Sequence, residues 1–128
     1  MFSRLPFMKE LTKAEEQIMR VLWDKRNCFV KDVIEALPDP KPAYNTVATF
    51  LKILSKKGFV GRRAIANTFE YYPLVDQTNY TDQYLKSFME KYFEGSLNKM
   101  MSFCVNKNNL SLQEYEELQE ILNQKKNE

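Results

Sequence analysis

Apolar residues recur at helical spacing in the first part of the chain. Leu11, Ile18, Val21 and Leu22 form one stripe, with Trp23 on its flank. Thr12 and Glu15 have the spacing of a capping box, so a helix is predicted over residues 12–26. A shorter apolar pattern over residues 30–37 predicts a second helix. Three nearby prolines end that helix and delay the next one until about Ala43.

The third predicted helix, over residues 43–57, has two different faces. One face carries an apolar stripe of Val47, Leu51 and Leu54, with Phe50 beside it. The other face repeats polar residues at helical spacing: Asn45, Thr49, Lys52 and Lys56. Amide, hydroxyl and ammonium groups along one line suit base edges and phosphates. An ordinary solvated face would mix Glu with Lys, and this one has no Glu.

A hairpin is predicted directly after the third helix. Gly58 is placed to end the helix in a left-handed conformation. Residues 59–64 and 68–73 are rich in β-branched and aromatic types and are separated by Ala66 and Asn67. Arg62 and Arg63 lie in the first of these strands. Three helices followed by a basic two-stranded wing predict a winged helix-turn-helix, a mainly helical α+β fold.

The composition changes after Asp76, which predicts two modules, residues 1–76 and 77–128. Helices are expected over about 78–94, on to about Val105, and after a Ser111–Glu114 capping pair. Their apolar faces are too large for so short a segment to bury alone, so we expect them to pack against the same segment of a second copy of the chain. The predicted dimerisation residues are Leu85, Phe88, Met89, Tyr92, Phe93, Leu118 and Leu122.

Charge is concentrated where the third helix and the hairpin are predicted. Between Pro40 and Phe69 the chain has six basic residues and no acidic one, although its total net charge is only +2. Clustered Lys and Arg bind polyanions through Coulomb attraction and counterion release. The DNA-binding residues predicted from these patterns are Asn45, Thr49, Lys52, Lys56, Arg62 and Arg63.

Several classes of function are disfavoured by what the chain lacks. It has no histidine and only three glycines, so His-based catalysis, common zinc sites and glycine-rich phosphate loops are absent. Its two cysteines, Cys28 and Cys104, form no metal or redox motif and are expected to be free thiols. No apolar run approaches the roughly 20 residues of a membrane span. We therefore expect a cytoplasmic, non-enzymatic protein without a metal or cofactor.

Four stretches in this order resemble the BlaI/MecI penicillinase-repressor family of bacterial transcription regulators. They are LTKAEEQIMRVLW from Leu11, NTVATFLKILSKKGFV from Asn45, FEYYPLV from Phe69 and LSLQEYEELQEIL from Leu110. The resemblance implies a dimeric winged-helix repressor that blocks transcription from a palindromic operator in double-stranded DNA. Thr46 and Thr49 match the Thr-x-x-Thr of the family's recognition helix, so the resemblance adds Thr46 to the predicted DNA-binding residues. Ala48 and Ile53 replace basic residues that many members carry there, so the operator sequence is not transferable.

The resemblance also implies a mode of regulation. Members that control β-lactamase genes are inactivated when a membrane sensor-protease pathway leads to cleavage of the C-terminal module. The matching bond here is Ser102–Phe103, where Ser102 replaces the family's Asn. The copper-responsive branch of the family uses C-terminal cysteine pairs, which this chain lacks.

Two alternatives remain open from the sequence. One is a winged-helix module whose basic hairpin binds an acidic partner protein. In that case duplex DNA would fail to compete with the partner protein for the same surface. The other is a regulator that activates transcription, which a reporter driven by its own promoter would distinguish from a repressor.

Overall fold

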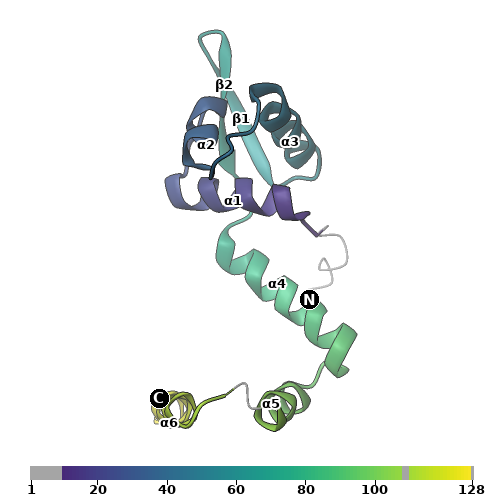
Figure 1. Ribbon diagram of the computed structural model, residues 1–128, viewed down its shortest axis with the longest axis vertical. Helices are drawn as coiled ribbons and strands as arrows, with labels where there is room; N and C mark the ends of the chain where they lie inside the picture. The colour runs from purple at the N-terminus through teal and green to yellow at the C-terminus, as the bar shows by residue number, and fades with distance from the viewer. Residues whose placement is uncertain (1–9, 108–109, 128) are drawn as a thin grey trace. The chain divides into compact units, whose positions relative to one another are not determined.

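The computed structural model describes residues 10–107 and 110–127. Residues 1–9 of the predicted N-terminal module and residues 108, 109 and 128 of the C-terminal one therefore lie outside the described residues. Within these described residues, six helices and two strands follow one another (Figure 1). In chain order they are α1 (Lys13–Lys25), α2 (Val30–Ala36), α3 (Tyr44–Lys56), β1 (Val60–Ile65), β2 (Thr68–Pro73), α4 (Gln77–Phe93), α5 (Leu97–Asn106) and α6 (Leu112–Lys126).

This order confirms the predicted mainly helical fold with a two-stranded wing, and each element lies within about two residues of its predicted range. The capping boxes predicted for α1 and α6 are both present, Thr12 with Glu15 and Ser111 with Glu114. The chain divides into two compact units, residues 1–84 and 85–128. Each unit is described by itself below.

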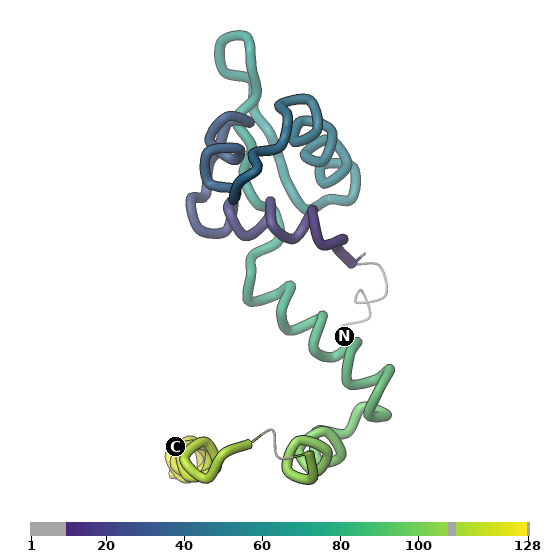
Figure 2. Tube along the Cα trace, in the orientation of Figure 1, coloured from purple at the N-terminus to yellow at the C-terminus, as the bar shows by residue number. Residues whose placement is uncertain are grey.

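The N-terminal unit packs α1, α2 and α3 around one apolar core, from which the hairpin projects (Figure 2). Each helix contributes residues at helical spacing, as expected when a helix buries one face. The most deeply buried members are Met19, Leu22, Cys28, Val33, Val47, Leu51, Leu54, Phe59 and Val60. The predicted apolar stripe of α3 is therefore confirmed as core.

The hairpin is tied to the helices at its base. β1 and β2 pair antiparallel, from Val60 opposite Pro73 to Ile65 opposite Thr68. Cys28, between α1 and α2, exchanges two backbone hydrogen bonds with Tyr71, of 2.9 and 2.7 Å, and so adds a single bridge at the free edge of β2. The sheet cannot slide relative to α2 without breaking these bonds.

A glycine connects α3 to the hairpin, as predicted. Gly58 has a φ of +85° and its N–H donates to the Ser55 carbonyl, while the N–H of Phe59 donates to the Leu54 carbonyl at 2.9 Å. These two bonds form a Schellman motif, which satisfies carbonyls at the end of the helix. The motif turns the chain so that Phe59, 1% exposed, enters the core immediately after α3.

The division between the units falls inside α4. The predicted module boundary at 76 and 77 coincides with the first residue of α4, but the compact units divide between Tyr84 and Leu85. Tyr80, in the second turn of α4, is 5% exposed and packs its ring 5.7 Å from Trp23 and 5.9 Å from Phe59. The indole N–H of Trp23 also donates to the Val75 carbonyl at 2.8 Å. The start of α4 is thus part of the N-terminal core.

The C-terminal unit contains the rest of α4 with α5 and α6. Aromatic rings pack against one another in this unit: Phe93 lies 5.9 Å from Phe88 and 5.7 Å from Phe103. Within residues 85–107 and 110–127, no side chain is buried. In the described parts of the chain, no helix combines the length and the hydrophobicity that a bilayer span requires.

One buried ion pair joins two helices of the N-terminal unit. The Glu15 side chain is almost fully buried, and one of its carboxylate oxygens accepts a 2.8 Å hydrogen bond from Lys57 Nζ. Burial alone would raise the pKa of Glu15, but the hydrogen bonds from Lys57 and Thr12 outweigh that effect and hold the pKa below its usual value. The pair fastens the end of α3 to the start of α1.

Replacing Lys57 by Met should lower the free energy of unfolding by about 1–3 kcal/mol at neutral pH, because a buried carboxylate loses its partner. Since the folded-state pKa of Glu15 is depressed, its stabilising effect is present above the ordinary value of 4.5 and is lost as pH falls through the folded value. The difference in unfolding free energy between wild type and Lys57→Met should therefore become smaller in acid. Urea unfolding at fixed protein concentration measures it.

Lys56→Met is the matched control, because Lys56 is the adjacent residue and is exposed. Its unfolding free energy should stay within about 0.5 kcal/mol of wild type. Equal destabilisation by the two substitutions would contradict the role assigned to the ion pair.

Candidate nucleic-acid interface

Helix α3 presents its predicted polar face to solvent. Asn45, Thr46, Thr49, Lys52 and Lys56 are all exposed. The opposite face is fixed in the core by Val47, Leu51 and Leu54, none more than 1% exposed. Because this stripe packs in only one orientation, the rotation of α3 about its axis is set, and the polar residues point outward together.

The first turn of α3 leaves its backbone donors without a side-chain cap. Its N-cap residue is Ala43, which makes no side-chain cap hydrogen bond, and the first turn has no acidic residue. Helices α1 and α6 both satisfy these N–H groups with capping boxes. Uncapped N–H groups and the positive end of the helix dipole favour an anion at this position.

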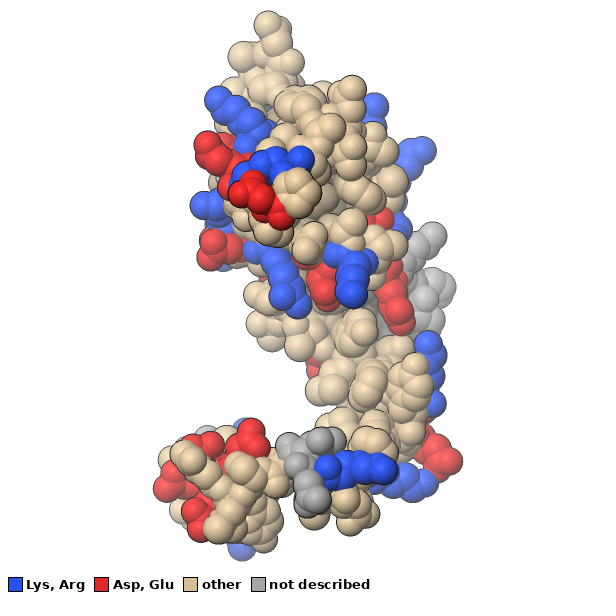
Figure 3. All heavy atoms as spheres, viewed as in Figure 1, with Lys and Arg blue, Asp and Glu red and all other residues tan. Residues whose placement is uncertain are grey.

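The basic residues of the Pro40–Phe69 segment are not equally available. Lys57 is bound to Glu15, and the Lys41 ammonium donates to the Glu35 and Leu37 carbonyls at the end of α2. Among the described residues, neither Lys52 nor Lys56 is part of an ion pair. On the face shown in Figure 3, basic and acidic side chains are interspersed over the helices and the tip of the hairpin has neither.

Both arginines of the wing are held by neighbouring side chains. The Arg62 guanidinium lies 4.1 Å above the centre of the Phe69 ring. Arg63 is directly opposite Glu70 in the strand register, and its Nε donates to Glu70 Oε1 at 3.0 Å. Both arginines remain exposed. Aromatic and carboxylate contacts restrict their rotamers while leaving the terminal guanidinium nitrogens open.

The sequence alone does not identify the acidic partners of Lys57 and Arg63. Glu15 was assigned only to a helix cap, and Glu70 lies one residue beyond the acid-free segment. The register between strands would have paired Glu70 with Arg63, given the turn at Ala66 and Asn67. No local pattern links Glu15 to Lys57, which lies 42 positions further along the chain.

Comparison with known proteins supplies the family. Residues 11–124 match the family described as "Penicillinase repressor". The chain belongs to the penicillinase repressor family. This confirms the resemblance predicted from the four motifs. Because the family consists of repressors, the protein is a DNA-binding transcriptional regulator and not an enzyme.

Individual relatives match over most of their length. The methicillin resistance regulatory protein MecI of Staphylococcus aureus strain N315 is 33% identical over 117 residues, which are 91% of this chain and 95% of that protein. The penicillinase repressor of Bacillus licheniformis is 29% identical over 119 residues, 92% of this chain and 93% of that protein. A solution structure of monomeric B. licheniformis BlaI in complex with the blaP half-operator is 27% identical, with a TM-score of 0.48 over 57% of this chain and 90% of that chain.

The candidate dimerisation and cleavage residues of the C-terminal unit are exposed or partly buried. Leu85, Phe88, Tyr92 and Leu122 are exposed, and Met89, Phe93 and Leu118 are partly buried. Ser102 and Phe103 lie within α5, and both are exposed. They line an open depression of about 580 Å³ together with Phe93 and polar residues of α5.

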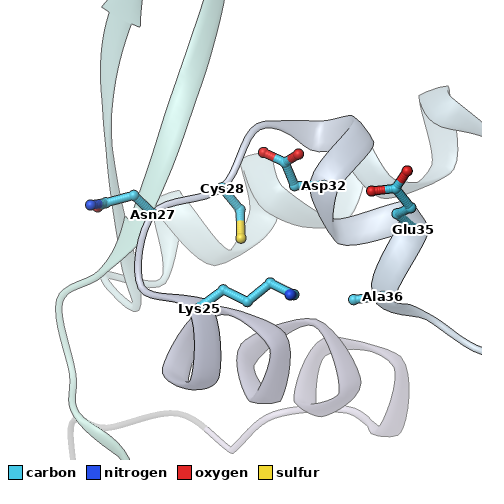
Figure 4. Close-up of a pocket in the computed structure, with 6 residues that line it drawn as sticks. All are labelled: Lys25, Asn27, Cys28, Asp32, Glu35 and Ala36. Carbon is cyan, nitrogen blue, oxygen red and sulfur yellow. The ribbon is translucent and has the colours of Figure 1, made fainter.

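A separate small pocket between α1 and α2 contains the Cys28 thiol (Figure 4). It measures about 200 Å³, and its lining includes Lys25, Asp32 and Glu35. Burial raises the pKa of the Cys28 thiol, and the charge of Asp32 adds to the shift. Cys28 is fully buried, whereas Cys104 is half-buried, and both are free thiols. We therefore expect the Cys28 thiol to react slowly in the folded protein.

Alkylation of the native protein with iodoacetamide should modify Cys104 well before Cys28. The reason is that a buried thiol with a raised pKa supplies little accessible thiolate. Mass spectrometry of peptides sampled over time measures the two rates, and denaturation in urea should make them similar. Faster labelling of Cys28 in the native state would contradict its burial in the core.

Proposed function

We propose that this repressor binds a palindromic operator as a homodimer and blocks transcription by occluding the promoter. One observation carries the proposal: α3 is held by a fully buried stripe and exposes a line of Asn, Thr and Lys without an acidic residue. Such a helix matches the recognition helix of a winged helix-turn-helix, which enters the major groove. Binding to operator DNA would place its site of action in the cytoplasm.

The exposed residues divide by the chemistry of their side chains. Asn45, Thr46 and Thr49 offer amide and hydroxyl groups, which read base edges. Lys52 and Lys56 on α3, and Arg62 and Arg63 on the wing, offer cations for phosphates. Base contacts discriminate between sequences by roughly 1–3 kcal/mol each, whereas phosphate contacts add affinity on any sequence.

Exposed apolar surface in the C-terminal unit supports the dimer. Leu85, Phe88, Met89, Tyr92 and Phe93 of α4, with Leu118 and Leu122 of α6, would form the interface. In a single chain several of these large side chains are exposed, and apolar surface exposed in this way is typical of protein interfaces. A two-fold symmetric dimer would present two copies of α3 to the two half-sites of a palindrome.

Release from DNA would follow cleavage of the Ser102–Phe103 bond, triggered through a membrane sensor-protease pathway. Exposure of both residues supports this part of the proposal. The bond lies in the interior of α5, so the helix must unwind locally before the backbone can enter a protease active site. Cleavage would separate α6 from α4 and thereby remove part of the proposed interface.

The decisive test is selection of genomic fragments by the purified protein at near-physiological salt, followed by sequencing. Enrichment of a palindrome with half-sites spaced by about one helical turn, or a multiple of it, would support a dimeric operator-binding repressor. Weak and uniform recovery would refute sequence-specific binding. It would favour an acidic protein partner for the basic surface instead.

Thr49→Ala and Lys56→Ala should affect DNA binding in different ways. Thr49→Ala should reduce operator affinity by about 1–3 kcal/mol with little change on random DNA, because it removes a base contact. Lys56→Ala should weaken binding to both and lower the slope of log K against log salt by about 1, because it removes a phosphate contact. Fluorescence anisotropy titrations across a salt series measure both effects, and equal losses on the two DNAs for both variants would refute the assignment.

Phe88→Asp should convert the dimer to a monomer at micromolar concentration, because it places a charge in the proposed apolar interface. Ser87→Asp is the matched control, since it introduces the same charge at the neighbouring exposed position of α4 and away from that apolar face. Sedimentation equilibrium measures the mass of each variant. A dimer that survives Phe88→Asp would place the interface elsewhere.

A further inference from the structure

A shallow groove lies where the first turns of α2 and α3 approach the hairpin. Its volume is about 340 Å³, and it is lined by Phe29, Val30, Lys31, Tyr44 and Thr68. None of these residues is among the DNA-binding residues predicted from the sequence. They come from three separate elements, and so only the folded chain brings them together.

The groove combines an apolar floor with a few polar groups. Phe29 and Val30 provide hydrocarbon surface, Tyr44 and Thr68 carry hydroxyls, and Lys31 carries a positive charge. No acidic residue lines it. Within the described residues Lys31 forms no ion pair, so its charge is available to a ligand.

These groups match the repeating chemistry of a nucleic-acid backbone. A deoxyribose ring has apolar carbon faces, and the phosphates beside it are anions that accept hydrogen bonds from hydroxyl and ammonium groups. A free apolar small molecule would leave the lysine and both hydroxyls unpaired. Charge complementarity therefore favours a nucleotide of the backbone over an uncharged ligand.

The position of the groove links the two parts of the proposed DNA interface. Tyr44 is the first residue of α3 and directly precedes Asn45 and Thr46, the residues proposed to read bases. Thr68 is the first residue of β2 and pairs with Ile65 next to the turn of the wing. A DNA strand that contacts both α3 and the wing has to pass between them.

We propose that this groove seats one sugar–phosphate unit of the operator in each half-site. Tyr44, whose side chain is 53% exposed, covers the deoxyribose, and Lys31 binds the adjacent phosphate. The assignment rests on the proposed operator binding and adds a backbone contact made by α2. It makes Lys31, Tyr44 and Thr68 positioning residues, because they fix the register of α3 in the major groove without reading a base.

The test uses the full-length protein and the operator duplex selected from genomic fragments. Single neutral methylphosphonate linkages are placed in turn at each position of both strands, and affinities are measured for wild type and for Lys31→Gln, Tyr44→Phe and Lys13→Gln. Lys13→Gln is the matched control, because Lys13 is an exposed lysine at the start of α1, away from the turn of the hairpin (Figure 1).

For wild type, one linkage in each half-site, between the bases that α3 reads and the wing, should weaken binding about tenfold. In Lys31→Gln the same linkage should have no further effect, and the salt slope should fall by about 1. Tyr44→Phe should retain the full linkage effect, because it keeps the ring that covers the deoxyribose, and Lys13→Gln should behave as wild type.

Two failures are distinguishable. If wild type selects a duplex and Thr49→Ala relaxes its specificity, but Lys31→Gln retains the full linkage effect, the groove proposal is overturned and operator binding stands. If wild type selects no duplex, operator binding fails and the groove proposal with it. Unchanged thermal unfolding of the variants excludes misfolding as the cause of any loss.

Discussion

The structure depends on a constraint that applies to α3: the helix can bury only one of its two faces. Val47, Leu51 and Leu54 fill the centre of the core, and each contributes roughly 1.5–3 kcal/mol through burial. The same packing fixes which residues remain outside. Packing of the apolar face in the core therefore determines which side chains of α3 are exposed and can contact DNA. The Schellman motif at Gly58 extends this control to the hairpin, because it sets the direction in which β1 leaves the helix.

Electrostatics in the N-terminal unit follow from packing in the same way. Six basic residues without an acidic neighbour in sequence suggest one uniform surface. In the folded chain, Lys57 pairs with the buried carboxylate of Glu15. Lys41 donates to a carbonyl at the end of α2, and Arg63 pairs with a carboxylate on the neighbouring strand. Lys52 and Lys56, which form no ion pair among the described residues, are left to act on a ligand at long range. The net charge of this segment thus overstates the charge that its own residues present to a partner.

Much of the fold was predictable because its signals are local. Helical spacing, the capping pairs at Thr12 and Ser111, and Gly58 after α3 all depend on residues a few positions apart. The inward and outward faces of α3 followed from the same spacing. The features that the sequence did not predict depend on contacts between residues that are far apart in the chain. Tyr80 lies beyond the change in composition at Asp76, yet it fills a space between Trp23 and Phe59. The groove beside Tyr44 has the same origin, since three elements supply its lining.

Within residues 85–107 and 110–127 no side chain is buried in a single chain, and this bears on how long the protein persists in a cell. Helices without a core of their own open readily, and open helices are the substrates of general proteases. A chain that has found a second copy would be protected, whereas a chain still alone would be degraded. Turnover would then fall as synthesis rises, so that the amount of repressor depends more steeply than linearly on its rate of production. An exposed apolar surface in one short segment would in this way set the lifetime of the whole molecule.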